Sequence, residues 1–352
     1  MKVLFLNRRC IKHPQRGGAE VYTMELARAV VERGGVAEWF SSRAKGLESE
    51  EVIDGVRFIR RGSELTTHFY GFFYALKKGK DWIIVDEFNG VGFFTFFLKN
   101  SVLLIHQLYQ ELWTAEFGIW GHVFKVLEKL LLKLYTNRKT ITVSKSTYED
   151  LKKLGFREIH IIPNGLDVIP LSSVPEKEET LHLVYLGRLK RTKNPEDAIK
   201  AFMLVKEKVK DAKLVLMGDG PMRTYLTRRY SDVEGLTFLG YVERELKHHT
   251  LERSHILLVP SIREGWGQVV IEANAFGTPA IGYRVHGLKD SIKHAQTGFL
   301  VKDYREMAQK VIQLWEDREL YHQIARNCLD WAKNFSWERT KREFLKLLES
   351  MA

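Results

Sequence analysis

The sequence predicts an α/β protein built on two doubly wound parallel sheets, and three observations support this. The chain has 352 residues, enough for two domains at roughly 150 residues per domain. Short apolar runs rich in Val, Ile and Leu alternate with longer segments of helical periodicity. This alternation is interrupted once, between residues 163 and 180, and then resumes. We therefore expect two halves of similar construction.

The expected strands are continuous apolar runs, which are typical of parallel strands covered on both faces. These runs are Val3–Leu6, Ile83–Val85, Val102–Ile105, Thr140–Val143, Ile159–Ile162, Leu183–Leu186, Leu214–Met217, Leu236–Leu239, Ile256–Val259 and Ala280–Ile281. Helices are expected between them, for example at Glu20–Glu32, Val123–Leu134, Pro195–Lys208 and Gly267–Ala275. Such units join parallel strands through right-handed crossovers.

The interruption at residues 163–180 contains three prolines, and its second half has few apolar residues. We interpret it as a linker and divide the chain into residues 1–172, 173–334 and 335–352. The last range contains an amphipathic helix, Trp337–Leu348, whose apolar side needs a surface to cover. Two sheets that face each other leave a cleft, which is a favoured place for a ligand.

Composition narrows the class of protein. Hydrophobic residues make up 45% of the chain and charged residues 28%, a balance that excludes disordered and collagen-like proteins. The two cysteines, Cys10 and Cys328, are far apart, so we expect neither a disulfide framework nor a paired-cysteine metal site. The net charge of +11 is spread over both halves without long basic runs. We expect no specific nucleic-acid binding; an anionic small molecule or a membrane surface fits equally well.

The sequence does not predict export or a membrane span. The first apolar run ends at Leu6 and is followed by polar and basic residues, which is too short for a signal peptide. The most apolar stretch, residues 91–105, is interrupted by Lys99 and Asn100 and falls short of the roughly 20 residues of a membrane helix. We expect a cytoplasmic protein, associated at most with the inner face of the cell membrane.

Two loops at strand ends are candidates for phosphate binding. Gly17 and Gly18 follow the first strand and open a helix, where amides can approach a phosphate, although a plain turn is equally consistent. No Gly-x-Gly-x-x-Gly pattern is present there, which counts against a nicotinamide dehydrogenase. Arg188 and Lys193 follow the strand Leu183–Leu186. Such cations can neutralise a diphosphate without a metal, although two solvated loop cations would look the same.

The segment 260–273 carries the strongest signal. Glu264 is expected to close a strand, and Glu272 lies within the following helix, eight positions further on. Gly265 and Gly267 allow tight backbone at the helix start, where free amides attract phosphate. A carboxylate at Glu272 can accept hydrogen bonds from both hydroxyls of a ribose. Two ordinary helix acids are the alternative, but Glu272 lies among apolar neighbours and needs partners there.

His106 follows the strand Val102–Ile105, at another carboxyl end. Contact with a sugar or with a proton in transfer fits this position, and so does a satisfied loop histidine. The other eleven histidines show no ligand spacing, so we predict no metal site.

Taken together, these residues resemble the retaining nucleotide-sugar glycosyltransferases of family 4, also called glycosyl transferases group 1. The resemblance covers nearly the whole chain, and the order and spacing of its motifs are highly specific. The motifs are Gly17-Gly18-Ala19-Glu20, His106, Val143-Ser144-Lys145, Pro163-Asn164-Gly165, Gly187-Arg188-Leu189 with Lys193-Asn194, Gly218-Asp219-Gly220-Pro221, Glu264 to Glu272, Gly277-Thr278-Pro279 and Gly298-Phe299-Leu300.

The resemblance implies the GT-B fold, in which two Rossmann-like domains face each other across a cleft. Residues 1–172 would bind the acceptor and residues 173–334 the nucleotide-sugar donor. The helix in residues 335–352 would cross back onto the first domain.

The resemblance also implies roles for single residues. Arg188 and Lys193 would hold the diphosphate, while His106 and Glu264 would contact the donor sugar; these four are the expected catalytic residues. Glu272 would bind the ribose hydroxyls. The other residues expected at the donor are Gly17, Gly18, Gly218, Val242, Gly265, Trp266, Gly267, Gln268 and Val269.

Two positions depart from the family pattern. Trp266 stands where the family usually has phenylalanine, which would reshape the donor pocket. Val85-Asp86-Glu87-Phe88 stands where many members have a histidine-bearing segment. That region belongs to the acceptor side, so the acceptor does not follow from relatives.

The implied reaction moves a sugar from a donor such as a UDP- or GDP-sugar to a hydroxyl acceptor, which could be a glycolipid, a polysaccharide or a small molecule. Configuration would be retained, and no metal or other cofactor would be needed. Two alternatives stay open: a nucleotide-sugar 2-epimerase of the same fold, and a non-catalytic basic protein that binds nucleic acid or a membrane.

One region of the first domain suggests contact with an anionic bilayer. Five phenylalanines lie within residues 88–97, and Phe69, Phe72 and Phe73 lie upstream, followed by Lys77, Lys78 and Lys80. Further lysines recur every four residues, at Lys125, Lys129 and Lys133, along one face of an expected helix. A core strand-helix unit with solvated lysines is the simpler interpretation.

Overall fold

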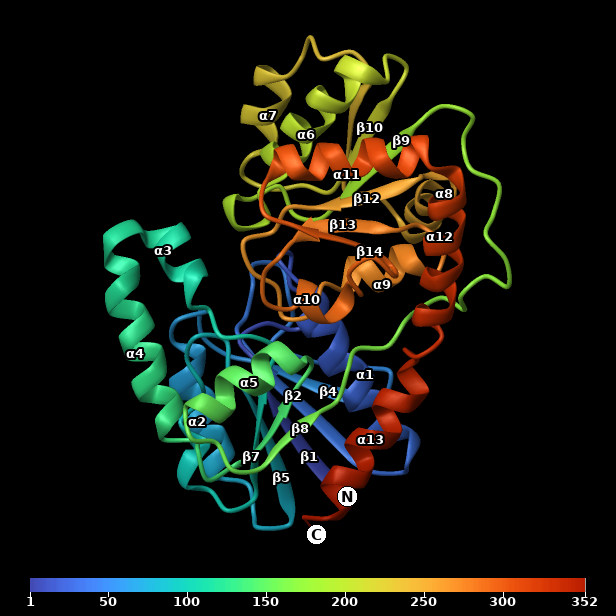
Figure 1. Ribbon diagram of the computed structural model, residues 1–352. Coiled ribbons are helices and arrows are strands. Elements are labelled where there is room, and N and C mark those ends of the chain that lie inside the picture. The colour runs from blue at the N-terminus through green and yellow to red at the C-terminus, as the bar shows by residue number, and fades with distance from the viewer. Residues whose placement is uncertain (352) are drawn as a thin grey trace. The chain divides into compact units, whose positions relative to one another are not determined.

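Figure 1 shows the computed structural model of the protein, which describes residues 1–351. The chain divides into two compact units. Unit 1 contains Met1–Gln110, His122–Gly165 and the chain from Ser336 onward, and unit 2 contains Glu111–Gly121 and Leu166–Phe335. Each unit has a largely parallel sheet with helices on both faces, so the predicted α/β class with two Rossmann-like sheets is confirmed.

Unit 1 is built on an eight-stranded sheet in the order β3-β4-β2-β1-β5-β6-β7-β8. The strands are β1 (Lys2–Leu6), β2 (Val36–Ser41), β3 (Glu50–Ile53), β4 (Val56–Arg60), β5 (Trp82–Glu87), β6 (Ser101–Ile105), β7 (Lys139–Thr142) and β8 (Ile159–Ile161). Neighbouring strands are parallel except β3 and β4, which form an antiparallel hairpin at one edge. Its turn residues Asp54 and Gly55 both have positive φ, which suits a tight two-residue turn.

Helices cover both faces of this sheet. They are α1 (Gly18–Glu32), α2 (Thr67–Leu76), α4 (Gly121–Lys133), α5 (Lys145–Lys153) and α13 (Trp337–Glu349), with a 3-10 turn at η1 (Thr95–Phe97). α1 and α13 lie on one face, and α2, α4 and α5 lie on the other (Figure 1). Successive side chains of β1 point to opposite faces of the sheet. The Phe5 ring packs 6.0 Å from the ring of Phe344 in α13, while Leu4 and Leu6 belong to one apolar cluster with Ala75 of α2.

Unit 2 is built on six parallel strands in the order β11-β10-β9-β12-β13-β14. The strands are β9 (His182–Leu186), β10 (Lys213–Met217), β11 (Leu236–Gly240), β12 (Ile256–Val259), β13 (Ala280–Tyr283) and β14 (Gly298–Val301). The direction of winding therefore reverses between β9 and β12. In open sheets of this kind, ligands bind beyond the carboxyl ends of the strands at such a reversal.

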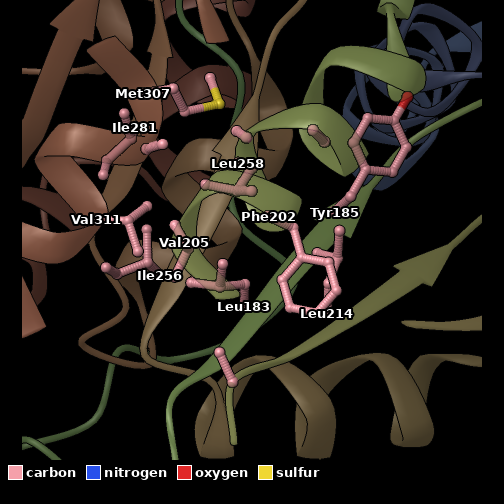
Figure 2. Packing of buried hydrophobic residues seen from close by; sticks show 14 of the residues in the cluster. Leu183, Tyr185, Phe202, Val205, Leu214, Ile256, Leu258, Ile281, Met307 and Val311 are labelled. Carbon is pink, nitrogen blue, oxygen red and sulfur yellow. The ribbon is translucent and has the colours of Figure 1, made fainter. Parts of the chain in front are cut away.

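The helices of unit 2 pack around two apolar clusters. They are α3 (Glu111–Phe117), α6 (Pro195–Lys208), α7 (Arg223–Arg229), α8 (Arg244–Arg253), α9 (Gln268–Asn274), α10 (Leu288–Ser291), α11 (Tyr304–Glu316) and α12 (Arg318–Ala332), with 3-10 turns η2 (Gly118–Trp120) and η3 (Arg191–Lys193). Figure 2 shows Leu183 and Leu214 of the strands beside Phe202 of α6, with Met307 and Val311 of α11 in the same cluster. This packing fixes the strands whose carboxyl ends carry the charged loops.

The last helix, α13, is part of unit 1. Trp337, Phe344 and Leu348 are buried there, and the Thr340 hydroxyl donates a hydrogen bond to the Pro163 carbonyl at 2.7 Å. The Lys341 ammonium pairs with Glu32 at 3.0 Å and with Glu25 at 3.2 Å, both on α1. The apolar stripe expected at Trp337–Leu348 therefore has its cover within unit 1.

The strands that the apolar pattern did not predict are β2, β3, β4 and β14. β2 and β4 contain charged residues that are buried as pairs, which breaks an apolar run. Glu38 of β2 is buried and accepts a hydrogen bond from the Tyr74 hydroxyl at 2.8 Å. Arg60 of β4 is fully buried and pairs with Glu51 of β3 at 2.5 Å. Across residues 1–351, no helix has the length and apolarity needed to cross a bilayer.

The anchoring of α13 gives the first prediction. We expect Phe344→Ala to lower the stability of unit 1 by about 3–5 kcal/mol, because it empties a fully buried site against Phe5. Chemical denaturation followed by circular dichroism measures this change. The exposed Lys346→Ala on the same helix serves as the control, with an expected change within about 0.5 kcal/mol. Equal midpoints for the two variants would contradict the anchoring role.

Candidate functional site

The charged loops of unit 2 meet at the strand reversal. One loop follows β9 and contains Arg188 and Lys193; the other follows β12 and leads to α9. The two are joined by a hydrogen bond from the Ile262 amide to the Thr192 carbonyl at 3.0 Å. The Leu189 amide donates to the Asp219 carbonyl at 2.9 Å, which adds the loop after β10. The structure thus brings together motifs that lie more than 30 residues apart in sequence.

Lys193 and Glu264 form an ion pair within this loop cluster. The Lys193 Nζ lies 2.5 Å from Glu264 Oε1. Side-chain exposure is 29% for the lysine and 12% for the glutamate, so both can still be reached from solvent. The Glu264 amide donates to the His286 carbonyl at 3.1 Å, which fixes the backbone beneath the carboxylate. Glu264 does not end a strand as expected, because β12 stops at Val259.

Cations outnumber acids in the loop after β9. Lys190 joins Arg188 and Lys193 there, and its Nζ lies 3.7 Å from a carboxylate oxygen of Glu116 in α3. Burial is the largest cause of a lowered pKa for Lys190, and the charges of Lys193 and Arg188 lower it further. A group of mutually repelling cations at a strand end attracts an anion.

Glycines allow these loops to approach each other closely. A Cβ on Gly218 would lie 2.0 Å from the Gly187 carbonyl oxygen, and one on Gly220 would lie 2.5 Å from that of Leu189. Both glycines also have positive φ. Gly267, at the start of α9, has φ +88, a conformation that glycine adopts without strain.

Glu272 is the fifth residue of α9 and has a cationic partner that the sequence analysis missed. The Lys247 Nζ of α8 donates to Glu272 Oε2 at 3.1 Å. Burial raises the pKa of Glu272, while the neighbouring Lys247 charge opposes this rise. Val242 and Val269 pack against the same apolar cluster of unit 2. The expectation that Glu272 needs a partner is met, although no sequence motif pointed to Lys247.

The remaining loop residues have different surroundings. Trp266 is buried with its ring 5.2 Å from that of Phe335, and its Nε1 has no hydrogen-bond acceptor among residues 1–351. Gln268 opens α9, directly after Gly267. Arg263 is buried and pairs with Glu111 at 2.5 Å, which holds α3 to unit 2. Residues 111–121 belong to unit 2 although the chain on both sides of them belongs to unit 1. The expected division into three unbroken ranges could not include such an insertion.

In unit 1, His106 belongs to a buried polar cluster at the carboxyl ends of β1, β5 and β6. Glu87 is its centre: Asn7 Nδ2 and Thr23 Oγ1 each donate to Glu87 Oε2 at 2.6 Å. His106 Nε2 lies 3.4 Å from Glu87 Oε1, and the Tyr22 ring meets the imidazole edge-on at 5.2 Å. Glu87 belongs to the segment that departs from the family pattern, and no role was expected for it from the sequence.

The Gly17-Gly18 turn lies at the start of α1. The Gly17 amide donates to Glu20 Oε2 at 2.6 Å, and burial followed by the nearby Glu87 charge raises the pKa of Glu20. Gly17 has extended backbone with φ −146, and a Cβ on Gly18 would meet no atom within 4 Å. The fold therefore does not demand a glycine at Gly18, and the space beside it is open.

The structure thus groups the expected residues within each unit. Arg188, Lys193, Gly218, Glu264 and the residues from Gly265 to Glu272 lie on the loops at the strand reversal of unit 2, with Val242 just after β11. His106, Gly17 and Gly18 belong to unit 1. No cluster of three or more His, Cys, Asp or Glu side chains suited to a metal ion occurs in the described part of the chain, residues 1–351.

Comparisons with known proteins agree across both units. The family model described as Glycosyltransferase Family 4 matches residues 16–169, and that of Glycosyl transferases group 1 matches residues 172–331. An uncharacterized glycosyltransferase of Methanocaldococcus jannaschii is 26% identical over 372 residues, covering 94% of each chain.

Solved structures show the same fold at low sequence identity. Sucrose-phosphate synthase from Thermosynechococcus elongatus is similar with a TM-score of 0.82 at 18% identity, covering 99% of this chain and 98% of that chain. An Anabaena protein in complex with UDP and glucose is similar with a TM-score of 0.74 at 16% identity, covering 99% and 100%.

The Lys247–Glu272 pair gives the second prediction. We expect Lys247→Met to raise the pKa of Glu272 further, because the buried carboxylate loses the charge that opposes its desolvation. The Glu272 side-chain carboxyl resonance, titrated by carbon-detected NMR, measures this shift. Lys247→Arg keeps the charge and should stay close to the wild type. An unchanged pKa in the methionine variant would show that Lys247 does not control Glu272.

Proposed function

Since the chain belongs to the group 1 glycosyltransferases of family 4 and has the GT-B fold, we propose that it moves a sugar from a nucleoside-diphosphate sugar to a hydroxyl acceptor. We further propose that configuration is retained and that no metal ion takes part. The observation that supports this most strongly is the excess of cations at the strand reversal of unit 2. The UDP and glucose held by the Anabaena structure support the same class of donor, such as a UDP- or GDP-sugar.

In this proposal Arg188 and Lys193 bind the diphosphate. Lys193 is paired with Glu264 at 2.5 Å, so an arriving diphosphate competes with that carboxylate for the ammonium. The competition frees Glu264 to accept hydrogen bonds from hydroxyls of the donor sugar. The amides between Gly265 and Val269 add donors for the phosphates at the start of α9.

The nucleoside is assigned to the other end of α9. Glu272 accepts both ribose hydroxyls, and Lys247 helps to keep this buried carboxylate ionised. Gly218 leaves its loop backbone close to that of Gly187, and Val242 after β11 contacts the base. This order places sugar, diphosphate and ribose along one line of residues from Glu264 to Glu272.

The proposed chemical step is attack on the same face of the sugar from which the diphosphate leaves. The bond between the anomeric carbon and the diphosphate oxygen breaks, and the bond to the acceptor oxygen forms. A phosphate oxygen of the leaving diphosphate accepts the acceptor's proton. Negative charge grows on the diphosphate, where Arg188 and Lys193 are already in place to stabilise it.

In unit 1, we assign His106 to contact with the donor sugar, on the basis of the family resemblance. Glu87 serves as its positioning residue, since it lies 3.4 Å from His106 Nε2 and is itself held by Asn7 and Thr23. Gly17 and Gly18 are assigned to the donor on the same basis, and the open space beside Gly18 is compatible with a ligand.

Two alternatives make different predictions in simple assays. A nucleotide-sugar 2-epimerase would release the epimerised sugar with no acceptor present. A non-catalytic nucleic-acid binder would shift nucleic acid in a gel, with an affinity that falls steeply as salt increases. The acid and cation pairs at the strand reversal favour transfer over both.

The role of the cations gives the third prediction. We expect Arg188→Ala and Lys193→Ala each to reduce turnover at least about 100-fold, because each removes a preorganised charge from the leaving diphosphate. Release of nucleoside diphosphate from a panel of UDP- and GDP-sugars measures turnover, with and without EDTA.

Arg191→Ala is the matched control, because Arg191 lies in the same loop but is exposed. It should retain most activity, and EDTA should have little effect on the wild type. Normal turnover in both test variants, or complete loss of activity with EDTA, would refute the metal-free proposal.

The role of Glu272 gives the fourth prediction. We expect Glu272→Ala to weaken nucleotide binding by about 1–3 kcal/mol, because charged hydrogen bonds to the ribose are lost. It should also reduce the preference for the ribonucleotide over its 2′-deoxy form. Thermal shifts with both nucleotides measure this, since a ligand at 100 times its Kd stabilises a protein by about 2.7 kcal/mol. An undiminished preference in the variant would disprove the ribose assignment.

A further inference from the structure

Helix α4 of unit 1 has an inverted distribution of polarity. Its acid Glu128 is buried, while four of its aliphatic residues and their C-terminal neighbour face solvent. We call these exposed residues the α4 stripe; they are Val123, Val126, Leu127, Leu130 and Leu134, with exposures between 46% and 58%. An exposed Leu is common by itself, but a contiguous apolar row on a surface helix marks an interaction site.

The inversion is fixed by the contacts of the buried side of α4. Glu128 accepts hydrogen bonds from the amides of Tyr109 at 2.7 Å and Gln110 at 3.2 Å, and from the Gln110 side chain at 2.7 Å. Leu132, one turn further on, is fully buried in the core with Leu103. The helix therefore cannot rotate the stripe inward without leaving a buried carboxylate unpaired.

The stripe forms one narrow band along the helix. Val126, Leu127, Leu130 and Leu134 follow Val123 by three, four, seven and eleven positions. At 100° per residue, these spacings place all five side chains within about a third of the helix circumference. Lys125, Lys129 and Lys133 run along the polar side of α4, and Lys133 borders the stripe directly. Among residues 1–351, none of these three lysines has an acidic side chain within ion-pair distance.

The aromatic region first expected to touch a bilayer is only partly exposed. Phe88 and Phe93 are fully buried in unit 1, whereas Phe69, Phe73 and Phe97 are between 51% and 62% exposed. Lys78 pairs with the buried Glu38 at 2.5 Å and lies 4.1 Å above the Trp82 ring, so it is not a free surface cation. On α4, by contrast, exposed aliphatic residues and lysines lie along one helix.

We propose that the α4 stripe and its lysine row form a docking surface for an anionic lipid bilayer. An apolar band flanked by lysines is typical of helices that lie in the membrane interface. The lysines add attraction to anionic headgroups, and their lack of internal acidic partners leaves that charge available. A second copy of the chain would bring identical lysine rows together, which disfavours a dimer through this face. This inference rests on the proposed function in one respect: the membrane to which the protein docks would carry the acceptor.

The test is co-sedimentation of the full chain with vesicles of phosphatidylcholine alone or mixed with phosphatidylglycerol. We expect binding to the mixed vesicles at low salt, release at high salt and little binding to the neutral ones. Leu127→Asp/Leu130→Asp should abolish binding. The loss of a single lysine should weaken binding by about five-fold. The triple variant Lys125→Glu/Lys129→Glu/Lys133→Glu should therefore weaken it by more than that. Both variants change exposed or half-exposed positions, so thermal unfolding should be close to that of the wild type.

Matched variants on other surfaces of unit 1 provide the controls. Val52→Asp/Leu65→Asp replaces two aliphatic residues that are also exposed, and Lys45→Glu/Lys99→Glu/Lys153→Glu makes the same charge change as the α4 lysine variant. The apolar control should bind like the wild type, and the lysine control should retain more binding than the α4 lysine variant. Release of nucleoside diphosphate from a soluble donor should persist in every variant, which separates docking from the proposed chemistry.

Three results would overturn the proposal. They are equal binding to neutral and anionic vesicles, no binding to either, and a concentration-dependent dimer in sedimentation velocity that Leu127→Asp/Leu130→Asp abolishes. The last result would assign the stripe to a second copy of the chain.

Discussion

The reversal of strand order between β9 and β12 determines where the charged groups of unit 2 lie. Strands on either side of the reversal carry their following loops in opposite directions, so two loops meet beyond the carboxyl ends with space between them. One loop contains Lys193 and the other contains Glu264, and an ion pair at 2.5 Å between these two side chains connects the loops. The close backbone approach at Gly218 and Gly220 depends on the same arrangement, because it brings the loop after β10 against the loop after β9.

Charge balance at this reversal explains why an anion is the natural ligand. Glu264 pairs with Lys193, and Glu116 lies 3.7 Å from Lys190. Burial is the first cause of the lowered pKa of Lys190, and the charges of Lys193 and Arg188 lower it further. A diphosphate would relieve that repulsion and would meet groups that need no reorganisation.

The sequence was sufficient for most of the architecture, and it identified loop residues that the structure brings together, because both depend on local patterns. Apolar runs located ten of the strands, and loop motifs located Arg188, Lys193, Glu264 and Glu272. The missed features depend on partners distant in sequence. β2 and β4 hide charges such as Arg60 in buried pairs, and Lys247 and Glu87 acquire meaning only beside Glu272 and His106. Such pairs leave no signal in the hydrophobic periodicity of the sequence.

Buried carboxylates in unit 1 organise the side chains around them. Glu87 gathers Asn7, Thr23 and His106, and Glu128 holds the backbone of Tyr109 and Gln110. Each acid is stable inside only because its hydrogen bonds replace water. In α4 this requirement determines the rotation of the helix, since satisfying Glu128 turns the aliphatic residues outward. An internal polar contact thus creates an external apolar surface.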